Sequence, residues 1–207
     1  MEPRSASLLP TPPSPLRKIL VAGSSHARGM NEVLGLVLGR GWVVEEMSLS
    51  GRGVREVGQA LFCRKDLSSF FCVILFVGGN DLFSKEGEYK SGQRVGEKLG
   101  ELRDKLLSSG VDRVVTNPIM LRSFIHNPRS DSIWHSLSKG KHLVNLYNRS
   151  AVLQNKLLNT FINPLNLSTK IPKDCYYSPD GLHLNEAGKL EIARAWVKYI
   201  ENWGNIL

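Results

Sequence analysis

The stretch KILVAGSSH, residues 18–26, sets a short apolar run directly before a Gly-rich turn. Four consecutive apolar residues bounded by glycine favour a buried strand, which we expect over residues 18–22. From residue 27 the pattern changes, because apolar residues recur at helical spacing, at Met30, Val33, Leu34, Val37 and Leu38. The stretch therefore predicts a strand that passes through a tight turn at Gly23 into a helix over residues 27–39.

Strands and helices alternate along the rest of the chain. Further strands are predicted over residues 42–47, 71–77, 111–116 and 159–163, and further helices over residues 54–62, 92–109, 141–158 and 186–203. The run 71–77 is the most apolar and is typical of a central parallel strand. The alternation predicts an α/β protein, a three-layer α/β/α fold with a central parallel sheet of five strands. Such folds bind ligands at the carboxyl ends of their strands.

The length of 207 residues suits one domain with a full core, which we assign to residues 17–207. Residues 1–16 are rich in proline, and we expect a disordered tail or a linker there. No apolar run approaches the roughly 20 residues that a membrane-spanning helix needs. The first 15 residues also lack the apolar core of a signal peptide. The sequence therefore predicts an intracellular protein without a membrane span.

The chain carries a net charge of +8. A positive charge attracts anionic substrates, nucleic acids and acidic membrane surfaces. The basic residues are scattered, however, and no aromatic residues alternate with them as they would in a base-stacking surface. We therefore favour a solvated basic surface and leave a nucleic-acid partner as the second possibility.

Three short polar stretches lie far apart in the chain and sit beside expected strand or helix ends: residues 23–26, 78–81 and 180–183. The first contains Ser25, in a turn between a strand and a helix. A hydroxyl at that place is exposed to a cleft, and the backbone N–H groups of the helix start face any anion formed there. Ser25 is therefore a candidate nucleophile. The local alternative is that Ser24 or Ser25 caps the following helix.

The third stretch pairs a histidine with a carboxylate. His183 can act as a general base, and Asp180, three residues earlier, can accept a hydrogen bond from the other ring nitrogen and so fix the tautomer. The local alternative is that Asp180 and Gly181 form a turn and Asn185 caps the last helix.

The second stretch supplies an amide donor. Asn80 follows two glycines at the end of the most apolar strand, where its side chain could donate to an oxyanion without adding charge. The alternative is a simple turn. Gly51, which follows the second strand, could present a backbone N–H to the same anion, because glycine lets the backbone approach a ligand closely.

These blocks, in this order and at these strand ends, resemble those of the SGNH hydrolase (GDSL esterase/lipase) superfamily over about residues 18–203. The family's Gly-Asp-Ser block corresponds to residues 23–25 and its Gly block to Gly51, with Gly53 as a second possibility. Its Gly-x-Asn-Asp block corresponds to residues 78–81, and its Asp-x-x-His block to residues 180–183.

The resemblance implies a role for each matching residue. Ser25 would be the nucleophile and His183 its base, oriented by Asp180. The N–H groups of Ser25 and Gly51 and the side chain of Asn80 would form the oxyanion hole. The fold implied is the SGNH, flavodoxin-like arrangement, and no metal or organic cofactor is expected. The three cysteines match no zinc-binding spacing.

One position departs from the family pattern, because Ser24 stands where the family usually has aspartate. That aspartate supports the nucleophile turn and breaks no bond, so the change bears on the rate of catalysis and does not imply its loss. Residues 23–29 also look similar to SGNH-like domains of animal retrotransposon-type proteins.

The sequence thus predicts a serine esterase that cleaves short, acetyl-like acyl groups from a small-molecule, glycan or lipid ester. Residues 82–92 and 119–140 would set the substrate preference. The first rival is an SGNH-like binding module for nucleic acid or an acidic partner, with weak or no turnover. The second is a flavodoxin-like domain that binds phosphate at residues 23–29. The sequence leaves the oligomeric state open.

Overall fold

The computed structural model of the protein describes residues 16–84, 86–90, 95–125, 127, 131–162 and 174–202. The tail expected over residues 1–16 lies outside these ranges, apart from Leu16. Within them, four strands form one sheet: β1 (Arg17–Gly23), β2 (Trp42–Ser48), β3 (Cys72–Phe76) and β4 (Arg113–Thr116). All pairs are parallel and the order is β2-β1-β3-β4, so the predicted parallel α/β fold is confirmed.

The helices are α1 (Met30–Leu38), α2 (Val54–Phe62), α3 (Gly79–Leu82), α4 (Val95–Ser108), α5 (Gly140–Ile162) and α6 (Glu186–Asn202). Short 3-10 turns are η1 (Ser25–Ala27), η2 (Leu67–Ser69), η3 (Ile133–His135) and η4 (Asp174–Tyr176). No helix within the described ranges is both long and apolar enough to cross a membrane.

The prediction of a fifth strand over residues 159–163 is wrong. Helix α5 continues through Ile162, and Asn163 lies outside the described residues. Thr160, Phe161 and Ile162 have high strand propensity, but propensity is a weak determinant when no helix-breaking residue intervenes. The first residue of that kind is Pro164. The helix therefore absorbs the segment that was expected to form the strand.

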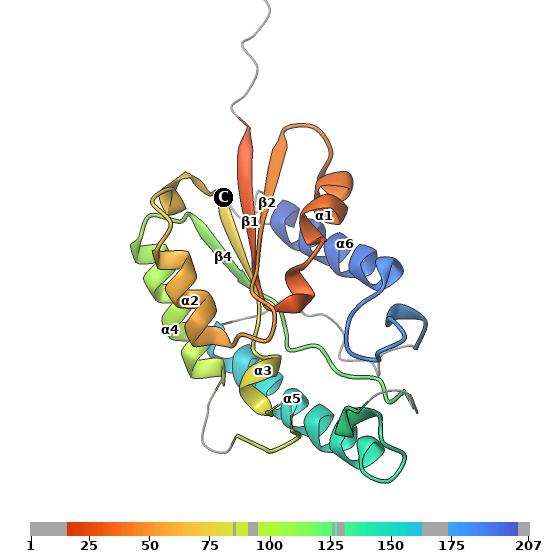
Figure 1. The fold of residues 1–207 in the computed structure, drawn as a ribbon. Coiled ribbons are helices and arrows are strands. Elements are labelled where there is room, and N and C mark those ends of the chain that lie inside the picture. The colour runs from red at the N-terminus through yellow and green to blue at the C-terminus, as the bar shows by residue number, and fades with distance from the viewer. Residues whose placement is uncertain are drawn as a thin grey trace, which may run out of the picture.

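Both faces of the sheet are covered by helices (Figure 1). Along β1 the side chains alternate: Leu20 and Ala22 belong to the core cluster under α2 and α4, whereas Ile19 and Val21 belong to the cluster under α1 and α6. All five residues of β3 are buried, as its continuous apolar run predicts. The sheet is thus the middle of three layers.

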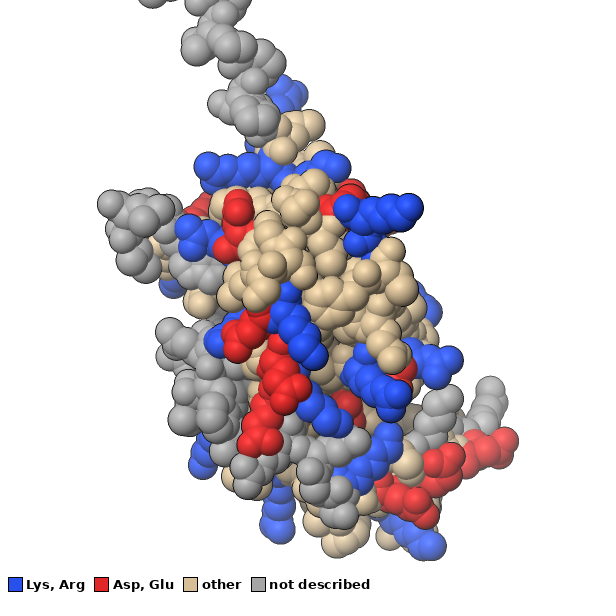
Figure 2. Space-filling model, turned by 90° about the vertical axis from the view of Figure 1, so that its left-hand side faces the viewer, with Lys and Arg blue, Asp and Glu red and all other residues tan. Residues whose placement is uncertain are grey.

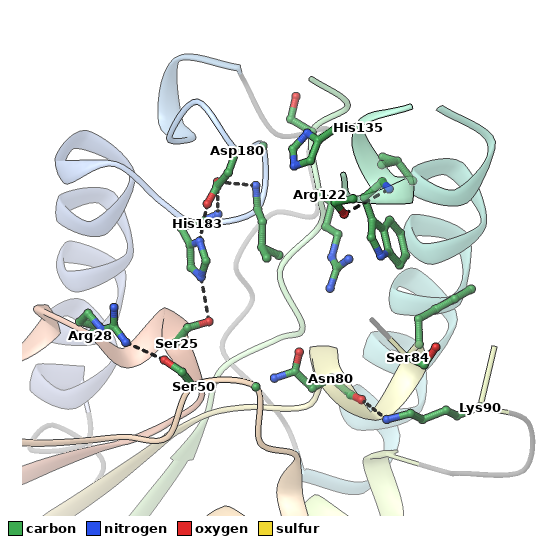
Figure 3. A pocket seen from close by; sticks show the side chains of 18 residues that line it. Ser25, Arg28, Ser50, Asn80, Ser84, Lys90, Arg122, His135, Asp180 and His183 are labelled. Atoms are coloured by element: carbon green, nitrogen blue, oxygen red, sulfur yellow. Dashed lines mark hydrogen bonds and ion pairs between the residues drawn. The ribbon is translucent and has the colours of Figure 1, made fainter. Parts of the chain in front are cut away.

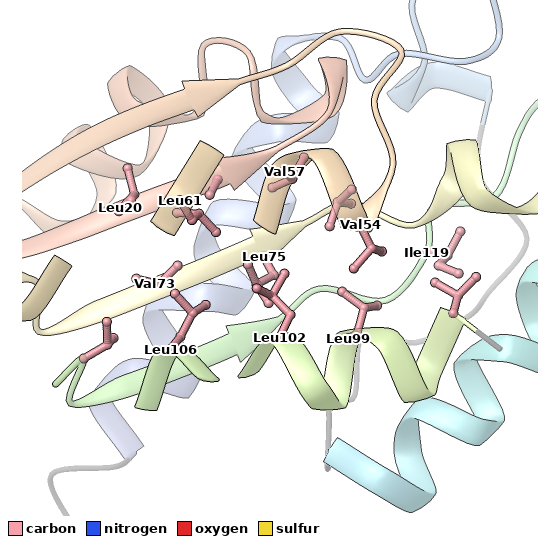
Figure 4. Close-up of a cluster of buried hydrophobic side chains, with 14 of the residues drawn as sticks. Leu20, Val54, Val57, Leu61, Val73, Leu75, Leu99, Leu102, Leu106 and Ile119 are labelled. Carbon is pink, nitrogen blue, oxygen red and sulfur yellow. The ribbon is translucent and has the colours of Figure 1, made fainter. Parts of the chain in front are cut away.

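The core between the sheet and α2 shows why these helices form. Val54, Val57, Gly58 and Leu61 are the buried residues of α2 and recur every three to four positions, so they make one stripe. They pack against the sheet and α4, as Figure 4 shows with Leu20, Leu75 and Leu102. This packing fixes the start of α2 at Gly53, close to the carboxyl edge of the sheet.

Helix α5 lies beyond the carboxyl ends of the strands (Figure 1). It contacts α4, α3 and η3 and contributes Tyr147 and Ala151 to the core cluster of α2 and α4. The turns after β1, β2 and β3 therefore face a wall supplied by α5 and the segment before it. The candidate site lies in this space.

Basic side chains do not gather into one surface on the face formed by α2 and α4. Figure 2 shows Lys and Arg interspersed with Asp and Glu there. Arg64, for example, pairs with Glu45 and Asp66 at N–O distances of 2.7 Å. This face has the solvated, mixed character that the sequence favours over a nucleic-acid interface.

Candidate active site

The turn that carries Ser25 follows β1 without a gap. A Cβ on Gly23 would lie 2.2 Å from the carbonyl oxygen of Phe76 on β3, so only glycine fits there. The N–H of Ser24 donates to that carbonyl at 3.2 Å, and the Ser24 carbonyl accepts from Ser48 Oγ at 3.0 Å. The turn is thus fixed through its backbone to both neighbouring strands, and Ser24 stands where the SGNH pattern that the chain resembles has aspartate.

Neither serine caps α1. The N-cap of that helix is Gly29, in a left-handed conformation with φ 72°, and its N–H donates to Glu46 Oε2 at 2.6 Å. Ser25 instead begins η1 and directs its hydroxyl away from the turn toward the loop before α6 (Figure 3). The capping alternative therefore does not account for these residues.

Ser25, His183 and Asp180 form one hydrogen-bonded chain, although 158 positions separate the first two. His183 Nε2 lies 2.8 Å from Ser25 Oγ, and His183 Nδ1 lies 2.5 Å from Asp180 Oδ2 (Figure 3). All three side chains are partly exposed, so a substrate can reach them. The structure brings together the three residues that the sequence proposes for catalysis.

Asp180 is held by its own loop. Its Oδ1 accepts hydrogen bonds from the backbone N–H groups of Leu182 and His183, both at 2.9 Å. Partial burial acts to raise the pKa of the Asp180 carboxyl, but hydrogen bonds from the His183 ring and these N–H groups outweigh it and lower the pKa. Asp180 therefore stays ionised and holds a proton on Nδ1 of His183, which leaves Nε2 to accept one.

The turn interpretation of residues 180–183 also holds. Gly181 has φ 64°, and a Cβ there would lie 2.2 Å from the carbonyl of Ser123. Asn185 caps α6, since its Oδ1 accepts from the Gly188 N–H at 2.9 Å. The same loop is a turn and a helix start, and it also positions the histidine.

Asn80 and Gly51 line the same cavity as Ser25 but belong to other segments of the chain. Asn80 belongs to α3, a short helix rather than the simple turn of the local alternative. Its amide donates one hydrogen to the Arg52 carbonyl at 3.0 Å, which leaves the second hydrogen for a ligand. Gly51 has φ 74°, and its N–H is not used in a hydrogen bond between described residues. These donors line one cavity together with Ser25.

Asp81, beside Asn80, anchors this arrangement. Its carboxylate is buried and accepts from the Val54 N–H at 3.0 Å, at the start of α2. A Cβ on Gly53 would lie 2.7 Å from Asp81 Oδ1, so the loop that carries Gly51 packs closely on α3. Burial raises the pKa of Asp81 above its ordinary value.

His26 is a further residue of the site that sequence reasoning left aside. Its Nε2 lies 3.0 Å from the carbonyl of Leu182, and its ring centroid lies 5.5 Å from that of His183. Burial, and then the nearby charge of His183, lower the pKa of His26 to about 4. His26 is thus neutral at pH 7 and ties the turn of Ser25 to the loop of His183.

The cavity above Ser25 has a volume of about 550 Å³, within the range of small-molecule sites. Opposite Ser25 it is lined by residues that the sequence did not single out, among them Phe83, Ser84, Lys90, Arg122 and Trp134. Lys90 and Arg122 belong to the two segments expected to set substrate preference. No three His, Cys, Asp or Glu side chains gather into a possible metal site in the described ranges.

The segment of Arg122 is attached to α5 by two asparagines. Asn155 pairs with both backbone groups of Ile119 at 2.7 and 2.9 Å, and Asn148 pairs with both backbone groups of Arg122 at 2.8 and 2.9 Å. The two asparagines are seven residues apart, so they share one face of the helix. That pattern, amides on the apolar face of a predicted helix, is the signal by which the segment could have been found.

Several solved structures share this fold. The carbohydrate acetylesterase Est24 from Sinorhizobium meliloti superposes with a TM-score of 0.64 at 17% sequence identity, covering 90% of this chain and 99% of that one. The inhibitor-bound aryl esterase of M. smegmatis gives 0.63 at 17% identity, over 90% and 99%. The acetyl xylan esterase AlAXEase gives 0.56 at 15% identity, over 88% and 99%.

At these identities the likeness establishes the fold. The structural neighbours include acylhydrolases, acetylesterases and an aryl esterase, and the predicted SGNH-like fold is confirmed. They give no support to the narrower resemblance to retrotransposon-type domains. No protein-family profile matches the chain, and no curated protein sequence matches it.

Proposed function

We propose that the protein is a serine esterase that acts through an acyl-enzyme. The observation that carries the proposal is the chain of hydrogen bonds from Ser25 Oγ to His183 Nε2 and from His183 Nδ1 to Asp180 Oδ2. A serine hydroxyl is a weak nucleophile unless a base lies within hydrogen-bond reach, and a base needs a partner that fixes its tautomer. These three side chains meet both requirements.

In the first half of the reaction, Ser25 Oγ bonds to the ester carbonyl carbon while His183 Nε2 takes the hydroxyl proton. The carbonyl oxygen becomes an oxyanion. It accepts hydrogen bonds from the N–H groups of Ser25 and Gly51 and from the free amide hydrogen of Asn80. The bond from carbon to the alcohol oxygen then breaks, and His183 gives its proton to the leaving alcohol.

In the second half, water replaces the alcohol. His183 takes a proton from water as the water oxygen attacks the acyl carbon, and the same donors hold the second oxyanion. The bond to Ser25 Oγ breaks, Oγ recovers the proton from His183, and the carboxylic acid leaves. Asp180 remains ionised throughout and stabilises the protonated imidazole.

We further propose a short acyl group, such as acetyl. Two of the three structures compared above are acetylesterases, of carbohydrate and of xylan, which supports an acetyl ester of a small molecule or glycan. The cavity volume of about 550 Å³ is compatible with such a substrate.

Hydrolysis of 4-nitrophenyl esters tests the proposal. Wild type is expected to cleave the acetate with an initial burst of nitrophenol, and faster than the octanoate. Ser25→Ala should abolish turnover, whereas Ser108→Ala, a change at an exposed serine on α4, should not. Full turnover by Ser25→Ala would refute the mechanism, and equal rates on acetate and octanoate would refute the short acyl group.

The binding-module rival predicts the opposite result from the same protein. It requires no turnover by folded wild type, together with binding to single-stranded RNA that weakens as salt is added.

A further inference from the structure

The guanidinium of Arg122 packs against two aromatic rings in the cavity. Its Cζ lies 4.3 Å from the ring centroid of Trp134 and 4.1 Å from that of Tyr147, within cation–π range. Figure 3 shows the group pointing into the cavity, across from Ser25. The two ring planes stand at 88° to each other with their centroids 6.0 Å apart, so the rings enclose the guanidinium from two sides, and its N–H groups remain available for hydrogen bonds on the side of the cavity.

The backbone of Arg122 is fixed as well, by the paired hydrogen bonds to Asn148 on α5. A cation held both at its backbone and along its side chain loses little freedom when it binds a ligand. Such preorganisation is a property of binding sites.

Within the described residues, Arg122 has no carboxylate partner, and its buried Nε has no hydrogen-bond acceptor. Arg64 and Arg194, by contrast, both form ion pairs. A charge held in a cavity without a counter-ion costs free energy, so an arginine placed in this way points to an anionic group that arrives with a ligand.

Most of the other charged side chains that line the cavity are positive as well. Arg28 and Lys90 also line it, and they bond to uncharged acceptors, Ser50 Oγ and the Asn80 carbonyl. The cavity-lining carboxylate, Asp180, is already engaged by His183. An anion therefore meets three cations there and no free carboxylate among the described residues.

We infer that the substrate is an ester with an anionic group, such as a carboxylate, on its acyl or alcohol part, and that Arg122 binds this group through the edge of its guanidinium. The inference rests on the proposed esterase function and narrows its substrate class. Arg122 would then determine specificity without taking part in bond breaking.

Matched pairs of esters test the inference. The acyl pair is 4-nitrophenyl hydrogen glutarate and its methyl ester; the alcohol pair is 4-acetoxybenzoate and its methyl ester. Spontaneous hydrolysis is subtracted, and each rate is divided by the rate with hydroxide. For wild type, kcat/KM should be about tenfold higher for the charged member of at least one pair, the effect of one charge-assisted interaction. Added salt should reduce this preference.

Variants assign the preference to Arg122. Arg122→Met keeps an apolar stem against the rings and should hydrolyse both members of the pair about equally, with neutral-ester activity retained. Arg40→Met removes the same charge from an exposed position between α1 and β2 and should keep the preference. A preference that survives in Arg122→Met overturns the inference. If Arg122→Met does not fold, Arg122→Lys should keep a reduced preference, and an undiminished one overturns the inference.

Binding to Ser25→Ala separates the inference from the esterase proposal. By calorimetry, this variant should bind the charged ester about tenfold more tightly than the methyl ester. Turnover without charge preference in either pair overturns the inference and leaves the esterase standing. Charge-selective binding without any wild-type turnover overturns the esterase and supports the anion site.

Discussion

The two walls of the cavity are built in different ways. The reactive wall, Ser25 with Asp180 and His183, is held by hydrogen bonds within its own loop and by the turn at the end of β1. The facing wall, Arg122 with Trp134, is held by side chains of α5 that are many residues away. On the proposed function, the reactive wall carries the chemistry and needs a fixed motif, whereas the facing wall selects the substrate and can change its side chains without changing the reaction.

The largest effect is expected when the proposed general base, His183, is removed. His183→Ala should lower kcat by about 10⁴- to 10⁶-fold, as for other residues of a triad that act as a unit. The loss should be the same for charged and neutral esters, because His183 belongs to the reactive wall. Steady-state rates on both pairs measure this, with His142→Ala at an exposed position on α5 as control. A loss confined to one pair would contradict the division.

Removing the amide donor comes next. Asn80→Ala should lower kcat by about 10²- to 10³-fold with little change in KM, the usual effect of one oxyanion-hole donor. The charge preference should stay, since Asn80 does not contact Arg122. A rise in KM with kcat unchanged would place Asn80 in ground-state binding instead.

The pH dependence of stability tests the contact between His26 and the Leu182 carbonyl, which joins two parts of the reactive wall. The pKa of His26 is about 4 in the fold and 6.5 ordinarily, so protonation favours the unfolded chain. The contribution of neutral His26 to the free energy of unfolding is complete above pH 6.5 and is lost as pH falls toward 4. The loss between pH 7 and pH 4 should be about 3 kcal/mol.

Urea unfolding of wild type and His26→Gln at the two pH values measures this loss. The variant can still donate to Leu182 and should lose about 3 kcal/mol less than wild type on acidification. Parallel losses in the two proteins would show that His26 is not held neutral.

The smallest effect is expected on the facing wall. Asn148→Ala frees the backbone of Arg122 and should reduce the charge preference about fivefold or less, while neutral-ester activity stays. Asn155→Ala removes the matching hydrogen bonds to the backbone of Ile119. Like Asn148→Ala, it should lower the free energy of unfolding by about 1–3 kcal/mol, but it should keep more of the charge preference. Kinetics on the ester pairs and urea unfolding give the two readouts. An equal loss of charge preference in Asn148→Ala and Asn155→Ala would mean that the hydrogen bonds from Asn148 to the Arg122 backbone have no special role.

The sequence predicts the reactive wall well for a physical reason. The turn at Gly23 and the loop at residues 180–183 are fixed by bonds between near neighbours or by a strict need for glycine, and both leave a local pattern. The helix over residues 54–62 is found with the same bounds, because its buried stripe is regular.

The facing wall and the last expected strand could not be predicted in this way. Arg122 is placed by Asn148 and two aromatic rings, contacts that depend on how α5 crosses the end of the sheet. The segment 159–163 was assigned from local propensity, and the continuation of α5 overrode it. In both places long-range packing decides the outcome.

Labelling with a fluorophosphonate probe tests whether Ser25 is activated, because the probe reacts with a serine only when a base activates it. Folded wild type should be labelled, the label should map to Ser25, and Ser25→Ala and His183→Ala should both remain unlabelled. Labelling of Arg122→Met should persist, since the facing wall does not activate the serine. Absence of label on folded wild type, or equal label on Ser25→Ala, would refute the proposed triad.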